Sequence, residues 1–253
     1  MNMRTLRGLL GLTWLEVKIF AREPLGLIGS VVVPVVAFML LGRAFSPNIP
    51  ETSPGQRATV GVDLAVFGAL LISINAVQSL VAIVAIYREG GILKRLRATP
   101  LRPLTILSAH IIVKLLFTGV TLTLTMLAGK RYLPPGMPIP WLAFGAATAI
   151  GMLGMLALGF LLASLAPTAR FAQPIASIVL YPMIGISGLF IPLDRLPGAL
   201  QLLAHLSPAT YAVSLMRGAW HHDTWLSHGS DLLSLAIIAA VSAVLASRLF
   251  RWE

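Results

Sequence analysis

The sequence predicts an all-α integral membrane protein with six transmembrane helices, an N-terminal interfacial helix and an outer re-entrant helical hairpin. Of its 253 residues, 57% are hydrophobic and 11% are charged, whereas about 25% are charged in an ordinary soluble domain. The mean hydropathy is +0.87. Since no water-soluble core could bury so much apolar surface, this composition excludes a disordered chain, a disulfide-stabilised secreted domain and almost any soluble globular domain.

The third observation is a series of six apolar runs, each near the length of about 20 residues that a helix needs to cross a bilayer. The runs are too long and too poor in charge for the alternating pattern of a membrane β-barrel. Helices are then the remaining way to satisfy every backbone group in lipid. Within a single transmembrane domain, 1–253, we expect spans at 25–41, 64–86, 106–128, 141–165, 171–191 and 232–249.

Basic residues between the runs predict the orientation. With the N-terminus in the cytoplasm, twelve Lys and Arg residues fall on the inside and six on the outside. This bias favours both termini in the cytoplasm. The net charge of +10 is spread between the apolar runs and forms no single patch, so we expect no nucleic-acid partner.

The first 23 residues are predicted to form a helix that lies on the membrane surface. Arg4, Arg7, Lys18 and Arg22 fall on one narrow stripe, and a broad apolar face opposes them. This arrangement is typical of interfacial helices, although a solvated N-terminal helix is an alternative. The pattern leaves Glu16, which lies off the basic stripe, without an explanation.

The third predicted span carries a polar stripe. His110, Lys114, Thr118, Thr121 and Thr125 recur at intervals of three or four residues and therefore share one helix face. Ionisable groups in a span usually face a bundle interior or an aqueous cavity, which makes this stripe a candidate wall of a transport path. Alternatively, the lysine extends to the interface and the threonines bond to their own helix.

The second predicted span carries Asn75, Gln78 and Ser79 within one turn. Amides in lipid need partners, so this face should meet another helix. We favour a packing role over a substrate contact for these side chains.

No motif for catalysis or cofactor binding is present. The one Gly-Lys pair, Gly129–Lys130, is followed by Arg131 and cannot form a phosphate-binding loop. The chain has no cysteine and no G-x-S-x-G motif. The cluster His221, His222, Asp223 and His228 lacks the spacing of zinc sites. We therefore expect no enzymatic activity in this chain alone, and neither a cofactor nor a metal.

Two segments outside the spans are distinctive. Residues 87–104 hold five basic residues interrupted by leucines, which predicts a short amphipathic helix around 92–98 that a soluble partner could bind. An ordinary positively charged cytoplasmic loop is the alternative. Residues 192–220 are rich in proline, and the apolar stretch 198–206 is too short to span. That stretch should lie at the outer interface or form a re-entrant hairpin.

In these segments the sequence resembles the permease subunit of type-2 ABC exporters. Family members carry a stretch close to E-R-G-T-L-K-R-L-R-A-T-P-L-S-P, and residues 89–103 are E-G-G-I-L-K-R-L-R-A-T-P-L-R-P. Members also carry G-x-x-x-P, L-P, N-P-x-x-Y and a later Arg. The corresponding residues are Gly188 to Pro192, Leu196–Pro197, S-P-A-T-Y at 207–211, and Arg217. Departures are Gly90–Gly91–Ile92 for Arg-Gly-Thr and Ser207 for Asn.

The resemblance implies roles for two sets of residues. The segment 87–104 would couple the chain to a separate nucleotide-binding ATPase subunit, through Glu89, Gly91, Leu93, Lys94, Arg95, Arg97 and Pro100. The hairpin 192–220 would close the outer mouth with Gly188, Pro192, Pro197, Pro208, Tyr211 and Arg217. The polar residues of the second and third spans, and not the resemblance, supply the possible substrate path: Asn75, Gln78, His110, Lys114, Thr118 and Thr121.

The implied protein is a multi-pass permease of a prokaryotic inner membrane that exports a hydrophobic or amphipathic substrate, such as a drug, an antibiotic or a lipid. A second permease chain, identical or not, would complete the pore, and ATP and Mg²⁺ would bind to the ATPase. One alternative is a secondary transporter or channel that acts without an ATPase, but the absence of a carboxylate from every predicted span weakens proton or sodium coupling. Another is a membrane-embedded regulator or assembly factor.

Overall fold

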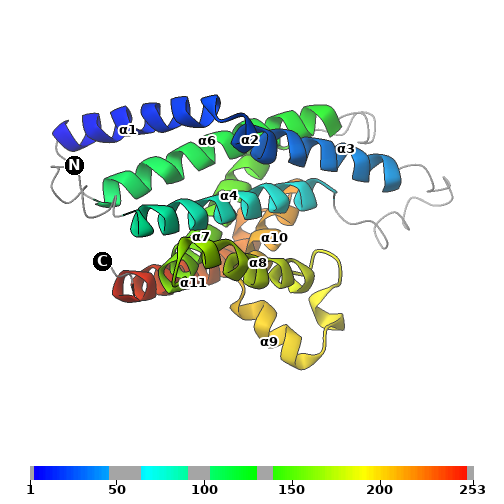
Figure 1. Ribbon diagram of the computed structural model, residues 1–253. Coiled ribbons are helices and arrows are strands. Elements are labelled where there is room, and N and C mark those ends of the chain that lie inside the picture. The colour runs from blue at the N-terminus through cyan, green and yellow to red at the C-terminus, as the bar shows by residue number, and fades with distance from the viewer. Residues whose placement is uncertain (1–2, 46–63, 91–102, 130–138, 250–253) are drawn as a thin grey trace.

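The computed structural model describes residues 3–45, 64–90, 103–129 and 139–249, and this part of the chain contains helices and no strand (Figure 1). The principal elements are α1 (Met3–Arg22), α2 (Pro24–Leu27), a π-helical turn (Ile28–Val32), α3 (Val33–Phe45), α4 (Leu64–Glu89), α6 (Pro103–Gly129), α7 (Trp141–Leu165), α8 (Ala169–Ile186), α9 (Gly198–Leu206), α10 (Pro208–Trp220) and α11 (Gly229–Leu249). Short 3₁₀ turns occupy Leu193–Arg195 and Trp225–His228.

Helix α7 is the centre of the bundle and packs against α4, α10 and α11. Glycines on its surface allow the close approach of its neighbours. A Cβ atom on Gly159 would lie 2.6 Å from Cγ1 of Val77 on α4, and a Cβ atom on Gly154 would overlap Leu235 of α11. The small residues of this span therefore let α4 and α11 pack close to α7.

Five of the described helices are long and apolar enough to cross a membrane: Val66–Tyr87, Ser108–Ala128, Trp141–Leu165, Ala169–Ile186 and Trp225–Leu249. A sixth segment passes the same test only as a bent pair, Gly8–Arg22 with Pro24–Leu40, whose two parts meet at 89°. The predicted first span at 25–41 thus belongs to a bent unit that begins in α1.

The π-helical turn between α2 and α3 has a local cause. The amide of Val33 donates to the carbonyl of Ile28, five residues earlier. Pro34 follows and has no N–H to donate. The carbonyls of Gly29 and Ser30 therefore lose the partners that a regular helix would supply, and they need donors from elsewhere in the bundle.

Helix α8 ends at Ile186, before the predicted end of the fifth span at residue 191. The reason is a turn in which Gly188 adopts a φ of +82°, a conformation that side-chain-bearing residues rarely adopt. The hydrophobic residues beyond this turn, Phe190 and Ile191, are 47% and 45% exposed. The last residues of the predicted fifth span thus lie in the exposed turn that follows α8, and not in the helix.

The segment after this turn contains two helices in different environments. Helix α9 lies on the surface, with Leu202 65% and Leu206 66% exposed. Helix α10 is buried along most of its length and packs against α7 and α11. In Figure 1, α9 projects from the bundle while α10 lies inside it.

Candidate functional site

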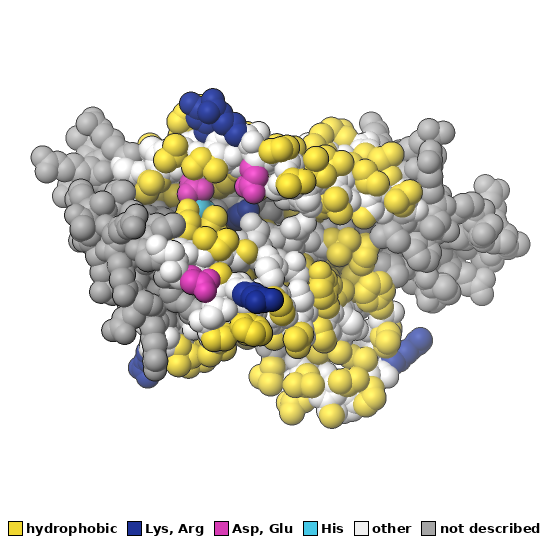
Figure 2. Space-filling model, in the orientation of Figure 1, with side chains coloured by type: hydrophobic (Ala, Val, Ile, Leu, Met, Phe, Trp, Pro, Cys, Tyr) yellow, Lys and Arg dark blue, Asp and Glu magenta, His cyan; other side chains and the backbone are white. Residues whose placement is uncertain are grey.

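A polar cavity of about 300 Å³ lies among α1, α2, α4, α6 and α8. Figure 2 shows acidic, basic and histidine side chains gathered in a hollow between apolar surfaces. The polar residues that line the cavity are Glu16, Glu23, Ser30, Asn75, Gln78, Ser79, His110, Lys114 and Gln173. We call this space the polar cavity.

His110 projects into the polar cavity from α6 and is 3% exposed. Its Nε2 atom lies 3.4 Å from Oε1 of Glu16, too far for a good hydrogen bond, and it has no hydrogen-bond partner among the described residues. The Tyr87 hydroxyl donates to the same Glu16 oxygen at 3.4 Å. The Glu16 carboxylate thus joins α1 to α4 and α6 by two long contacts.

Lys114 lies one turn further along α6. Its ammonium is 4.6 Å from the centroid of the Phe20 ring, which is a cation–π distance. In the described part of the chain, no carboxylate lies within ion-pair distance of this ammonium. The lysine therefore stands in the cavity without a closely bound counter-ion.

The cavity wall beside Lys114 is fixed by the two carbonyls that the π-helical turn leaves open. The Asn75 amide donates to the Gly29 carbonyl at 2.8 Å, and the Thr121 hydroxyl lies 3.3 Å from the Ser30 carbonyl. These contacts tie α4 and α6 to the turn. Asn75 thus meets another helical segment, as expected for an amide in a span, and the same residue also lines the cavity.

The amides of Gln78 and Gln173 join α4 to α8. Gln173 Nε2 donates to the Gln78 carbonyl at 3.3 Å, and Gln78 Nε2 lies 3.4 Å from the Ser177 hydroxyl. Both distances are long for such bonds, so the α4–α8 side of the cavity is held less tightly than the side facing the π-helical turn.

Thr118 and Thr121 line a smaller adjacent cavity of about 20 Å³, together with Asn75 and Lys114. The Thr121 hydroxyl also donates to the Phe117 carbonyl at 2.8 Å, and the Thr118 hydroxyl lies 3.2 Å from the sulfur of Met152. The structure therefore combines both sequence interpretations of the stripe, because Lys114 faces a cavity while the threonines are occupied with helix contacts.

The structure brings all six predicted path residues to one region. It adds five polar residues that were not among them: Glu16, Glu23, Ser30, Ser79 and Gln173. One signal for Glu16 was present, namely a carboxylate off the basic stripe of the N-terminal helix. Glu23 and Gln173 gave no such signal, since their role depends on which helices meet.

Only the edges of the predicted coupling segment are described. Glu89 at the end of α4 accepts a hydrogen bond from the Ala169 amide at the first turn of α8, at 3.0 Å. A carboxylate is favourable there because the N-terminus of a helix carries partial positive charge. The other predicted coupling residues, Gly91, Leu93, Lys94, Arg95, Arg97 and Pro100, lie outside the described residues.

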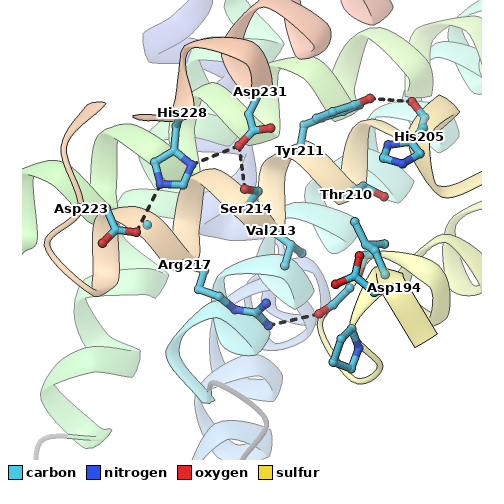
Figure 3. A pocket seen from close by; sticks show the side chains of 15 residues that line it. Asp194, His205, Thr210, Tyr211, Val213, Ser214, Arg217, Asp223, His228 and Asp231 are labelled. Carbon is cyan, nitrogen blue, oxygen red and sulfur yellow. Dashed lines mark hydrogen bonds and ion pairs between the residues drawn. The ribbon is translucent and has the colours of Figure 1, made fainter. Parts of the chain in front are cut away.

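A second pocket, of about 360 Å³, lies between α10 and the turns that flank α9 (Figure 3). We call it the hairpin pocket. One nitrogen of Arg217 lies 3.2 Å from the Gly188 carbonyl and 3.5 Å from the Leu189 carbonyl, and the Tyr211 hydroxyl donates to the His205 carbonyl at 2.9 Å. The side chains of α10 thus bind the backbone of the preceding segment at two places, before and after α9.

The other side of the hairpin pocket is a network centred on His228. Its Nδ1 atom lies 3.1 Å from Asp231, its Nε2 atom lies 3.4 Å from Asp223, and the Ser214 hydroxyl donates to Asp231 at 2.7 Å. Among the described residues, no group of three or more His, Asp or Glu is arranged to hold a metal ion. The cluster joins α10 to the start of α11.

The six predicted gate residues separate into two groups. Gly188, Pro192, Tyr211 and Arg217 line the hairpin pocket. Pro197 and Pro208 instead mark helix starts: Pro197 directly precedes α9, and Pro208 is the first residue of α10. The sequence analysis grouped His228 with Asp223 but did not include Asp231 or Ser214, because their contacts depend on how α10 meets the start of α11.

Comparison with known proteins identifies the family of this chain. The sequence profile of the ABC-2 type transporter family matches residues 7–220. This range includes most of α1, every residue that lines the polar cavity, and the part of the hairpin pocket that comes before the His228 network. The chain belongs to the ABC-2 type transporter family. It is also 28% identical over 225 residues to a protein of Cyanophora paradoxa named "Putative transport permease ycf38", covering 86% of this chain and 75% of that protein.

Membership of the ABC-2 family, together with the apolar helices, makes this chain a multi-pass membrane transport subunit rather than a catalyst. The family also implies an ABC transporter in which an ATPase is a partner.

Proposed function

We propose that this ABC-2 chain is the permease subunit of an ATP-driven exporter in a prokaryotic inner membrane, with both termini in the cytoplasm. A separate ATPase subunit binds and hydrolyses ATP with Mg²⁺, and a second permease chain completes the pore. The substrate is a hydrophobic or amphipathic molecule, such as a drug, an antibiotic or a lipid, and it passes through the polar cavity by alternating access.

The observation that carries this proposal is the double connection at the end of α4. Tyr87 contacts Glu16 of α1, and Glu89 binds the first turn of α8. Both contacts lie immediately before the segment 91–102, where the ATPase would dock. A movement of that segment would therefore reach α1 and α8, which are two walls of the polar cavity.

The cavity itself suits a transport path because its walls come from several helices that can move relative to one another. On the α8 side the contacts are long, whereas on the side of the π-helical turn they include a short bond from Asn75. We expect α8 to move away from α4 more easily than α4 moves away from the π-helical turn. Opening on the α8 side would expose the cavity to a second permease chain or to lipid.

The experiment is co-purification of the chain with an ATPase subunit from the same operon, followed by an ATPase assay with amphipathic compounds. We expect a stable complex whose hydrolysis rate responds to these compounds. Replacing Glu89 and Arg97 together with Gln should lower the stimulated rate, while Arg195→Gln, in the exposed turn beside α9, should not. A chain that remains alone and transports without ATP would instead support a secondary transporter.

A further inference from the structure

The carboxylates and the ammonium that line the polar cavity do not pair with each other. Glu16 and Glu23 contribute carboxylates from the α1–α2 side, and Lys114 contributes an ammonium from α6. Within the described residues, neither carboxylate forms an ion pair with this ammonium. Opposite charges thus line one cavity of about 300 Å³ and remain separate.

His110 independently points to a polar ligand group. The residue is 3% exposed and lines the cavity, and its Nε2 atom has no hydrogen-bond partner among the described residues, with Oε1 of Glu16 3.4 Å away. Leaving a buried polar atom unpaired costs about 1–3 kcal/mol. A polar ligand group beside His110 and Lys114 would remove that cost.

Apolar residues extend from the charged end of the cavity to the surface. Ile19 and Leu25 line the cavity and are 52% and 81% exposed. Lys114 lies eight residues beyond Ile106, where the predicted third span begins, and therefore about 12 Å into that span at 1.5 Å per residue. A hydrocarbon chain could lie along the apolar rim while its head group reaches the charged wall.

From this arrangement we infer that the polar cavity binds the head group of a zwitterionic amphiphile, with its anionic group against Lys114 and His110 and its ammonium against Glu16 and Glu23. The two carboxylates would repel a head group that is only anionic, and the lysine ammonium would repel one that is only cationic. A zwitterionic head is the charge type that satisfies both walls. The inference rests on the proposed transport role of the cavity and names its substrate class.

The test is native mass spectrometry of the purified chain in mild detergent, titrated with lipids that share dipalmitoyl chains and differ in head group. The probes are phosphatidylethanolamine (zwitterionic), phosphatidylglycerol (anionic) and a trimethylammonium-propane lipid (cationic). We expect phosphatidylethanolamine to bind roughly tenfold more tightly than either of the others, a difference of about 1.4 kcal/mol. Water-soluble phosphorylethanolamine should not compete, because it lacks the chain that contacts Ile19 and Leu25.

Two variants assign the preference to the cavity. Lys114→Met should remove the preference over the cationic lipid, and the double variant Glu16→Gln/Glu23→Gln should remove the preference over the anionic lipid. Asp194→Asn, in the hairpin pocket, is the matched control and should change neither. If a variant does not fold, the relative affinities of the three lipids for the unaltered chain still test the preference for a zwitterionic head group.

Equal binding of all three lipids, tightest binding of a singly charged lipid, or competition by the free head group would overturn the inference. So would a preference that neither variant alters. Because lipid binding is measured without the ATPase, a positive result here with no ATP-driven transport would contradict the proposed function and leave the binding site standing.

Discussion

The polar cavity and the hairpin pocket have similar volumes but are built in opposite ways. In the hairpin pocket, Arg217 is bound to backbone carbonyls and His228 lies between two aspartates. In the polar cavity, Lys114 contacts an aromatic ring and His110 has no hydrogen-bond partner among the described residues. The hairpin pocket has one exception, because the buried Thr210 hydroxyl that lines it has no hydrogen-bond partner among the described residues. Arg217 and His228 are nevertheless paired, which suits a structural role, whereas unpaired charged and buried polar groups around a space favour a ligand. We therefore expect the hairpin pocket to stabilise the fold and propose the polar cavity as the binding site.

The largest expected effect on stability is in the hairpin pocket. Arg217→Ala removes the guanidinium that bonds to the carbonyls of Gly188 and Leu189. Since a hydrogen bond to a charged group contributes about 1.5–3 kcal/mol, and the second contact is long, we expect the free energy of unfolding to fall by about 2–4 kcal/mol. Denaturant titration in detergent measures it. Arg195→Ala, at an exposed site, should cost less than about 0.5 kcal/mol, and an equal loss in both variants would remove the structural role.

A smaller loss is expected for Asp231→Asn. This change keeps the shape of the side chain but weakens its bonds to His228 and to Ser214. We expect the same titration to give a loss of about 1–2 kcal/mol. Asp194→Asn is the matched control, because Asp194 is exposed and lines the same pocket. If the two aspartates behave alike, the His228 network does not stabilise the junction of α10 and α11.

Asn75 is the part of the polar cavity that most resembles the hairpin pocket, because its side chain is bonded to a backbone carbonyl of another segment. Asn75→Leu removes the donor to the Gly29 carbonyl. Polar contacts between membrane helices contribute about 0.6 kcal/mol on average and up to about 1.7 kcal/mol. We expect a loss in that range, while Ser79→Ala, on the same helix and in the same cavity, should lose less. No loss on removing the Asn75 amide would mean that the π-helical turn does not depend on it.

The smallest effect on stability is expected for Lys114→Met. Loss of the contact with Phe20 is offset because a partly buried ammonium without a close carboxylate no longer has to be desolvated. The free energy of unfolding should therefore change by less than about 0.5 kcal/mol. A loss as large as that of Arg217→Ala would show that Lys114 is structural and would abolish the contrast between the two pockets.

The sequence was sufficient for whatever depends on composition and local pattern. Apolar run lengths predicted a helical membrane protein, and the spacing of four residues placed His110 and Lys114 on one helix face. Both side chains line the polar cavity, which was one of the two interpretations that the spacing allowed. The resemblance in the segments around 89–103 and 188–217 predicted the family. These features are carried by neighbouring residues and do not require knowledge of which helices meet.

Features that depend on contacts between distant segments could not be predicted. Glu16 reaches the cavity because α1 packs along α6, and Gln173 reaches it because α8 lies beside α4. The fifth apolar run gave no sign that its helix stops at Ile186, since the residues beyond the Gly188 turn are equally hydrophobic. The burial of α10 against α7 is likewise a property of the bundle.

The most direct test of the central claim is cysteine accessibility in the complex with its ATPase, which is simple because the chain has no native cysteine. Ser79→Cys places a thiol in the polar cavity, and Ser227→Cys places one on an exposed turn as the control. We predict that ATP with vanadate slows labelling of position 79 by a membrane-impermeant maleimide roughly tenfold, because closure of the cavity takes the thiol away from water. The control should not change. Equal labelling of position 79 with and without nucleotide would contradict an ATP-driven path through this cavity.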